Sequence, residues 1–220
     1  KVINFLKKFK MNNFIKIIYC PPNTLIRPMS KKLKNSPINV GAQNCHENEN
    51  HGPFTGSVNS KMLKNVGAKF VIIGHSENRQ RGENNKLINI KIKSALKAGL
   101  KVIFCIGETS VEKRKKITKK ILHKQIKLGL DKIKNKNKII IAYEPIWSIG
   151  TGMIPKSEDL FDTINFIKKK FKNFKVLYGG SVNTKNINDL KLIDNIDGFL
   201  IGGASQDSKK FIDIIKKTYN

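Results

Sequence analysis

The stretch IIIAYEPIWSIGTG, residues 139–152, decides the fold. Its first five residues are apolar, and three are β-branched, which is typical of a strand covered on both faces in a parallel sheet. Glu144 follows directly, and Pro145 ends the ladder because it has no backbone N–H to donate. The stretch therefore predicts a buried strand, 138–143, that brings one carboxylate to the edge of a sheet.

The residues after this strand predict a lid. Residues 146–149 are too apolar for an idle surface loop, and two glycines follow them. That composition suits a segment, 145–155, that closes over a ligand and excludes water. The alternative is that Glu144 caps the strand and Trp147 anchors the core, and for one isolated Glu this alternative is the better one. The other strand ends decide between the two.

Outward from this stretch, short apolar strands alternate with amphipathic helices. Such alternation favours parallel pairing with right-handed crossovers, in an open doubly wound sheet or a closed barrel. Seven strands and eight helices are predicted, and a helix stands before the first strand, whereas a βα unit begins with its strand. We therefore expect one further strand upstream of Lys1. With it, the chain would form one domain, 1–220, that is a (βα)8 barrel. The predicted strands are 15–20, 38–43, 70–74, 101–106, 138–143, 175–178 and 197–201. The predicted helices are 1–12, 25–34, 62–66, 87–98, 110–133, 157–172, 184–192 and 208–218.

Lysine dominates the charge of the chain, which is +27 from 43 Lys and Arg against 16 Asp and Glu. Such a balance could indicate nucleic-acid binding. Only four of the basic residues are arginines, however, and readout of bases and phosphates relies on the guanidinium group. The lysines are also dispersed over every helix. We therefore expect no nucleic-acid partner, although a positive field still attracts anionic substrates.

Composition also bears on the compartment. No run approaches the ~20 apolar residues that span a membrane, and the start does not resemble a signal peptide. Cys20, Cys45 and Cys105 are odd in number and widely spaced, which fits a reducing compartment better than a disulfide framework. We expect a soluble, cytoplasmic protein with no membrane partner.

Polar groups and glycines collect at the predicted strand ends, where (βα)8 barrels carry their chemistry. Two of them, His75 and Glu144, can transfer protons, although a lone histidine is more often a satisfied core residue. The glycine pairs after the last two strands let bare backbone N–H groups approach an oxyanion. The set suggests proton abstraction next to the carbonyl of a small phosphorylated compound.

Seven motifs occur in order from the second strand to the last helix. They are GAQN (41–44), FTG (54–56), VIIGHSENR (71–79), FCIGE (104–108), AYEPIWSIGTG (142–152), YGGSV (178–182) and GFLIGGAS (198–205). Together they resemble the motifs of the triosephosphate isomerase family. The resemblance implies a TIM barrel that interconverts dihydroxyacetone phosphate and glyceraldehyde 3-phosphate, with no cofactor and no metal ion.

The resemblance also implies roles for single residues. Glu144 is the base that moves a proton between C1 and C2, and His75 is the neutral electrophile that polarises the carbonyl. Backbone N–H groups hold the phosphate, and they belong to Gly150, Ser181, Gly202 and Gly203. Supporting positions near the active site or in the lid are those of Glu77, Cys105, Trp147 and Thr151.

One departure from the family concerns its electrophilic lysine, which lies in an Asn-x-Lys pattern at the end of the first strand. Lys10 is not this residue, because Lys8 stands two positions before it. We expect the lysine on the upstream strand. If the protein lacked that strand, the barrel would be open, and a phosphate-ligand-binding barrel with impaired catalysis would be the alternative function.

The loop 44–56 inserts, by resemblance, into a neighbouring subunit, which implies a homodimer. The family's Glu after FTG and Arg after GHSE are here Ser57 and Asn78, so both charges are lost together and neither is left buried alone. The same loop carries Cys45, His46, Glu47, Glu49 and His51. Their spacing fits no strong zinc pattern, and we expect no metal there.

Overall fold

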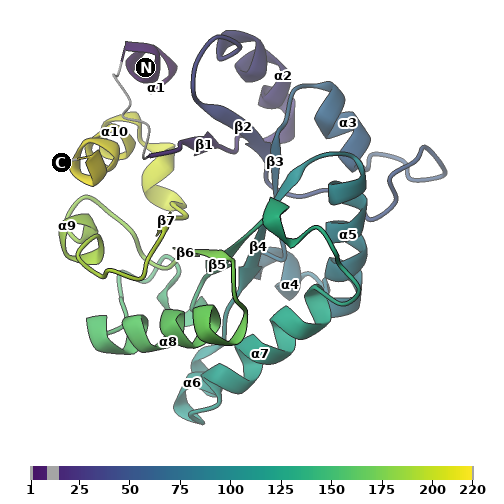
Figure 1. Cartoon of the computed structure of the whole chain (residues 1–220). Coiled ribbons are helices and arrows are strands. Elements are labelled where there is room, and N and C mark those ends of the chain that lie inside the picture. Colours follow the sequence, from purple (N-terminus) through teal and green to yellow (C-terminus); the bar gives the residue numbers. More distant parts are fainter. Residues whose placement is uncertain (1, 9–14, 220) are drawn as a thin grey trace. The chain divides into compact units, whose positions relative to one another are not determined.

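The computed structural model describes residues 2–8 and 15–219 (Figure 1). By their internal contacts, the residues form two compact units. Unit 1 comprises Lys1–Val2, Cys105–Lys127 and Ile140–Asn220, and unit 2 comprises Ile3–Phe104 and Leu128–Ile139. The organisation of the chain as one domain stays a prediction.

The strands follow one another in chain order, and the described residues hold seven of them. Pairing is parallel from β1 to β4 and again from β5 to β7. Every strand falls inside a predicted range, although the first and last keep only two residues each. The strands are β1 (Ile18–Tyr19), β2 (Asn39–Ala42), β3 (Phe70–Ile73), β4 (Lys101–Ile106), β5 (Ile139–Tyr143), β6 (Lys175–Tyr178) and β7 (Gly198–Phe199).

The core of each unit lies between its strands and its helices. All four residues of β3 are buried, as expected for a parallel strand with both faces covered. In unit 2, α2, α3 and α5 lie outside the strands (Figure 1). In unit 1, α8 buries Leu160, Ile164 and Ile167 completely, at the i, i+4, i+7 spacing of one helix face.

The helices agree with the predicted ranges except in three places. The α4 helix was not predicted, because its sequence SENRQ has no apolar period. The α9 helix covers only four residues of the predicted range 184–192. The predicted range 110–133 contains two helices instead of one. Residues 9–12 of the first predicted helix lie outside the described residues. The helices are α1 (Val2–Lys8), α2 (Asn23–Lys32), α3 (Ser60–Asn65), α4 (Ser76–Gln80), α5 (Asn85–Lys97), α6 (Ser110–Arg114), α7 (Thr118–Gly129), α8 (Ser157–Lys170), α9 (Ile187–Leu190) and α10 (Ser208–Tyr219). Among the described residues, no helix combines the length and the apolar character needed to cross a membrane.

The prediction of one long helix over 110–133 is wrong, because the chain turns at Lys116. Its φ of 56° is left-handed, its N–H donates to the Lys113 carbonyl, and the N–H of Ile117 donates to the Glu112 carbonyl. These two bonds form the Schellman motif that ends many helices. Glycine usually occupies the left-handed position, so a lysine there gave no stop signal in the sequence.

Replacing Lys116 by glycine should stabilise the fold. Lys116→Gly removes the steric cost of a left-handed side chain, about 1 kcal/mol, and raises the urea midpoint of unfolding. Lys115→Gly is the matched control, since it removes the same charge one residue earlier, where φ is −75°. That control should lower the midpoint. Equal effects of the two substitutions would contradict this account.

Candidate functional site

The backbone of Glu144 continues the sheet one residue beyond β5. Its N–H donates to the Ile106 carbonyl at 2.8 Å, and the N–H of Gly179 donates to the Tyr143 carbonyl at 2.8 Å. Glu144 is only 3% exposed. A Cβ on Gly179 would lie 2.8 Å from the Glu144 Cγ, so glycine leaves room for this carboxylate. Backbone bonds on both sides therefore give the carboxylate a defined position at the sheet edge.

A second buried carboxylate, Glu108, lies on the neighbouring strand end. It is 1% exposed and accepts hydrogen bonds from the Tyr143 hydroxyl at 3.2 Å and from the Trp147 Nε1 at 2.9 Å. Burial raises the pKa of Glu108, and the hydrogen bond from Trp147 is the largest opposing influence. The Lys113 ammonium lies 3.4 Å from the centre of the Trp147 ring, in cation–π geometry. Glu108 thus anchors the beginning of the lid.

Sequence reasoning assigned no role to Glu108, although the FCIGE motif contains it. The signal that identified Glu144 was a carboxylate at the end of an apolar strand. Glu108 shows the same signal, with Gly107 between it and the last residue of β4. The pairing with Trp147 spans 39 residues of sequence and only becomes visible in the structure.

The lid also contacts the loop after β6. The Gly152 N–H donates to the Ser181 Oγ at 3.0 Å, and this hydroxyl donates to the Ser148 carbonyl at 2.7 Å. Thr151 acts within the lid, where its hydroxyl points to the Trp147 carbonyl at 3.1 Å. Unit 1 therefore brings together the lid and one of the predicted phosphate-binding positions.

The other predicted phosphate-binding positions are open glycines. Gly150 has a φ of 70°, where only glycine is free of strain, and it is exposed. Gly202 and Gly203 are exposed at the start of a 3-10 turn, Gly203–Gln206, and a Cβ on either would contact nothing. Their backbone is thus accessible to a ligand. Cys105, by contrast, is completely buried within β4.

His75 and Glu77 lie in unit 2, at the amino end of α4. His75 caps this helix, and its Nδ1 accepts a hydrogen bond from the Glu77 N–H at 3.4 Å. An accepting Nδ1 leaves the proton of a neutral ring on Nε2. The Glu77 side chain is exposed. Because Glu144 belongs to unit 1, the pairing of His75 with Glu144 stays a prediction.

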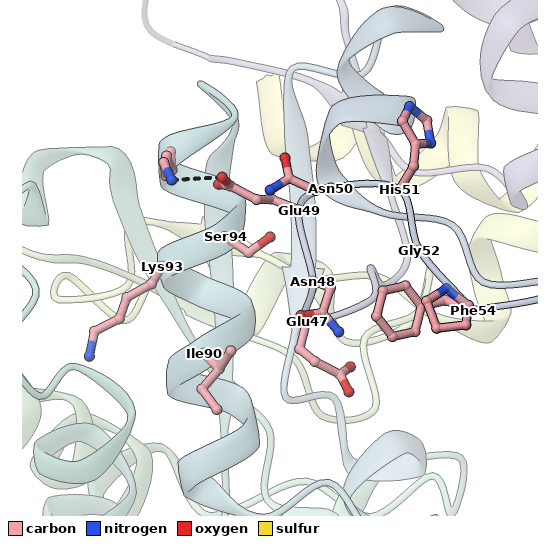
Figure 2. Close-up of a pocket in the computed structure, with 12 residues that line it drawn as sticks. Glu47, Asn48, Glu49, Asn50, His51, Gly52, Phe54, Ile90, Lys93 and Ser94 are labelled. Atoms are coloured by element: carbon pink, nitrogen blue, oxygen red, sulfur yellow. Dashed lines mark ion pairs between the residues drawn. The ribbon is translucent and has the colours of Figure 1, made fainter.

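A cleft of about 470 Å³ lies elsewhere in unit 2, between residues 47–54 and α5 (Figure 2). Figure 2 shows the loop on one side and the helix on the other, joined by an ion pair of 2.6 Å between Glu49 and Lys97. Phe54 lies against the His46 ring, with ring centres 4.7 Å apart. None of the predicted catalytic residues lines this cleft. Within the described part of the chain, no three His, Cys, Asp or Glu side chains are grouped to hold a metal ion.

Comparison with known proteins relates the chain to one family. The sequence profile described as "Triosephosphate isomerase" matches residues 1–218. The triosephosphate isomerase of Thermodesulfovibrio yellowstonii is 43% identical over 205 residues, which cover 89% of this chain and 83% of the relative. That of Endomicrobium trichonymphae is 36% identical over 232 residues, covering 98% and 92%. The crystal structure of triosephosphate isomerase from Bartonella henselae has a TM-score of 0.85 at 34% identity, covering 93% of this chain and 87% of that one. The predicted fold class, a TIM barrel, is confirmed.

The substitution Glu108→Gln tests the cost of burying this carboxylate. Because its pKa is raised above the ordinary value of 4.5, the folded state holds a proton at pH values where the unfolded state has released it. The resulting stabilisation is complete below pH 4.5 and is lost as the pH rises through the folded pKa. We expect the unfolding free energy of the unsubstituted protein, relative to that of Glu108→Gln, to increase as the pH falls from 7 toward 4.5 in urea titrations. A constant difference over this range would contradict the raised pKa.

Proposed function

The chain belongs to the triosephosphate isomerase family, and from that membership we propose that it interconverts dihydroxyacetone phosphate and glyceraldehyde 3-phosphate in glycolysis and gluconeogenesis. The observation that carries this proposal is the position of Glu144. Its side chain is buried at the carboxyl end of β5, where the Glu144 N–H donates to the Ile106 carbonyl and the preceding Tyr143 carbonyl accepts from the Gly179 N–H. A general base needs such a defined geometry, because proton transfer depends on distance and alignment.

In the proposed reaction, the Glu144 carboxylate removes a proton from C1 of dihydroxyacetone phosphate and returns it to C2, while the C1 hydroxyl loses a proton and the C2 oxygen gains one. The negative charge that develops on the carbonyl oxygen is stabilised by a hydrogen bond from the Nε2–H of neutral His75. The accepting Nδ1 of His75 supports this tautomer. Only protons move, and the proposal requires neither a cofactor nor a metal ion.

The phosphate of the substrate is held, in this proposal, by backbone N–H groups of Gly150, Ser181, Gly202 and Gly203. The accessibility of the three glycines supports such contacts. The lid, 145–155, then shields the enediolate from water, which would otherwise favour loss of the phosphate. Trp147 and Thr151 support the lid, and Cys105 and Glu77 support the site from their strand and helix.

We also propose a cytoplasmic homodimer built through the loop 44–56. The cleft beside this loop, with Phe54 half-buried at its edge, supports a surface that another subunit covers. The net charge of +27 gives a field that attracts the anionic substrate. We propose no nucleic-acid partner, because the positive charge is carried mainly by dispersed lysines.

Removing one methylene from the proposed base is the direct test. Glu144→Asp withdraws the carboxylate, and we expect kcat for glyceraldehyde 3-phosphate to fall about 10²- to 10³-fold with an unchanged circular dichroism spectrum. Glu158→Gln, an exposed carboxylate in the first turn of α8, is the matched control and should keep full activity. Unchanged turnover by Glu144→Asp would refute the role of Glu144 as the base.

The same assay decides between the two candidate functions, because the family's Asn-x-Lys pattern is not found in residues 1–220. Turnover of glyceraldehyde 3-phosphate supports the isomerase. If the folded protein does not turn over the substrate but binds inorganic phosphate, the phosphate-ligand-binding barrel replaces the enzyme.

The proposed dimer can be tested at the loop. Phe54→Asp places a charge where the partner subunit would cover the loop, and we expect a shift from dimer to monomer in sedimentation velocity. Leu192→Asp is the control, since Leu192 is 73% exposed and lies outside the loop. A dimer that survives Phe54→Asp would contradict the proposed interface.

A further inference from the structure

The hydroxyl of Ser148 joins three segments of unit 1. Ser148 is completely buried, and its Oγ donates to the Met153 carbonyl at 2.5 Å, within the lid. The same oxygen lies 3.1 Å from the Tyr178 hydroxyl and accepts a hydrogen bond from the Ser181 N–H at 3.2 Å. One donor and two acceptor positions are all that a serine hydroxyl offers, so each is used if Tyr178 donates.

Ser148 and Ser181 are bonded reciprocally. The Ser181 N–H donates to the Ser148 Oγ, and the Ser181 Oγ donates to the Ser148 carbonyl at 2.7 Å. The Gly152 N–H adds a third bond by donating to the Ser181 Oγ at 3.0 Å. Both ends of the lid turn, at Ser148 and at Gly152, are thus tied to a single residue of the loop after β6. We call these three bonds the clasp.

The packing around the clasp leaves no room for another group. A Cβ on Gly180 would lie 2.6 Å from the Ser148 Oγ and 2.2 Å from the Tyr178 hydroxyl oxygen. The loop backbone therefore passes directly against the buried hydroxyl. This close approach limits the access of water to the Ser148 hydroxyl, which makes its hydrogen bonds costlier to leave unmade.

The clasp also involves a group that binds the substrate in the function proposed above, on which this inference rests. There, the Ser181 N–H donates to the phosphate; here it donates to the Ser148 Oγ. We propose that Ser148 is a positioning residue that stands in for a phosphate oxygen and holds the lid to the phosphate-binding loop before substrate arrives. When the phosphate enters, the Ser181 N–H donates its hydrogen bond to the phosphate instead of to the Ser148 Oγ. The Ser148 hydroxyl keeps its hydrogen bonds with the Met153 carbonyl and the Tyr178 hydroxyl.

A lid that is held in place beforehand increases the fraction of enzyme that is ready to bind. Apparent affinity for a phosphate ligand is the intrinsic affinity multiplied by that fraction. Without the Ser148 hydroxyl, the Met153 carbonyl and the Ser181 N–H lose a buried partner and gain one when the lid opens to water. Once the phosphate is bound, it takes the place of the Ser148 Oγ as the acceptor for the Ser181 N–H. Loss of the hydroxyl should therefore weaken binding and leave the chemical step unchanged.

The test is the substitution Ser148→Ala, and Ser30→Ala is the matched control. The Ser30 hydroxyl also joins separate segments, because it donates to the Val66 carbonyl at 2.7 Å, but it lies in unit 2. Trp147 is the only tryptophan, so its quenching by acrylamide reports on the lid without any turnover. For Ser148→Ala we expect stronger quenching, which saturating inorganic phosphate returns to the unsubstituted level. We also expect KM and the inhibition constant of inorganic phosphate to rise about tenfold, the scale of one to two hydrogen bonds, while kcat stays within about twofold. Cysteine is of similar size to serine but is a weaker donor, so the quenching and the KM of Ser148→Cys should lie between those of Ser148→Ala and those of the unsubstituted protein. Ser30→Ala should change none of these values.

Three outcomes would overturn the proposal. Quenching and affinity like those of the unsubstituted protein would show that the Ser148 hydroxyl does not hold the lid. Tighter binding of inorganic phosphate by Ser148→Ala would show that Ser148 competes with the ligand. A lower kcat at unchanged KM would place Ser148 in the chemical step. If the folded protein lacks isomerase activity but the variants show the expected quenching and phosphate affinities, the proposed function fails and the proposed role of Ser148 is retained.

Discussion

The continuation of the parallel ladder past β5 is the constraint on which the site in unit 1 depends. Glu144 is held between two flanking strand ends, and each contributes a glycine at the point of contact. A Cβ on Gly107 would lie within 1.8 Å of the Glu144 carbonyl oxygen, and one on Gly179 would approach its side chain. The sheet can therefore present a carboxylate at its edge only because both neighbours lack side chains. Backbone bonds between strands are short and directional, which gives the carboxylate a position that a surface loop would not.

Burying carboxylates at this edge has consequences for the lid. Glu108 is as buried as Glu144, and a buried carboxylate is costly unless donors surround it. Tyr143 and Trp147 supply those donors. The hydrogen bond from Trp147 therefore both satisfies the Glu108 carboxylate and holds the first residues of the lid in place. Directly after Trp147, Ser148 and Ser181 satisfy each other in the same way, and the Gly152 N–H adds a second anchor by donating to the Ser181 Oγ. The lid is thus polar where it is anchored and open at Gly150 between the anchors.

The elements that could be predicted from sequence are those with a strong local pattern. Each strand was found because a short run that holds three to five apolar residues and is flanked by breakers has few other interpretations. The predicted helix 110–133 was wrong because its turn depends on a left-handed Lys116, where the residue type carries no signal. The helix α4 was missed for the opposite reason: it is polar throughout, and its position after β3 and its cap by His75 define it instead. Glu144 and the lid residues were found through the strand-end position and the family's motifs, whereas the roles of Glu108 and Ser148 were not.

By itself, the sequence determined the parallel α/β class, the strand positions and the family, because hydrophobic runs, turn residues and motifs are local properties of the chain. Only the tertiary structure decided which groups satisfy one another. Glu108 and Trp147 are 39 residues apart, and Ser148 and Ser181 are 33 apart. The residue type of a serine or a glutamate does not identify its hydrogen-bond partner when that partner is distant in the sequence. A buried polar group must find donors or acceptors among whatever the fold brings near it, and that set is defined only once the strands have paired and water has been excluded.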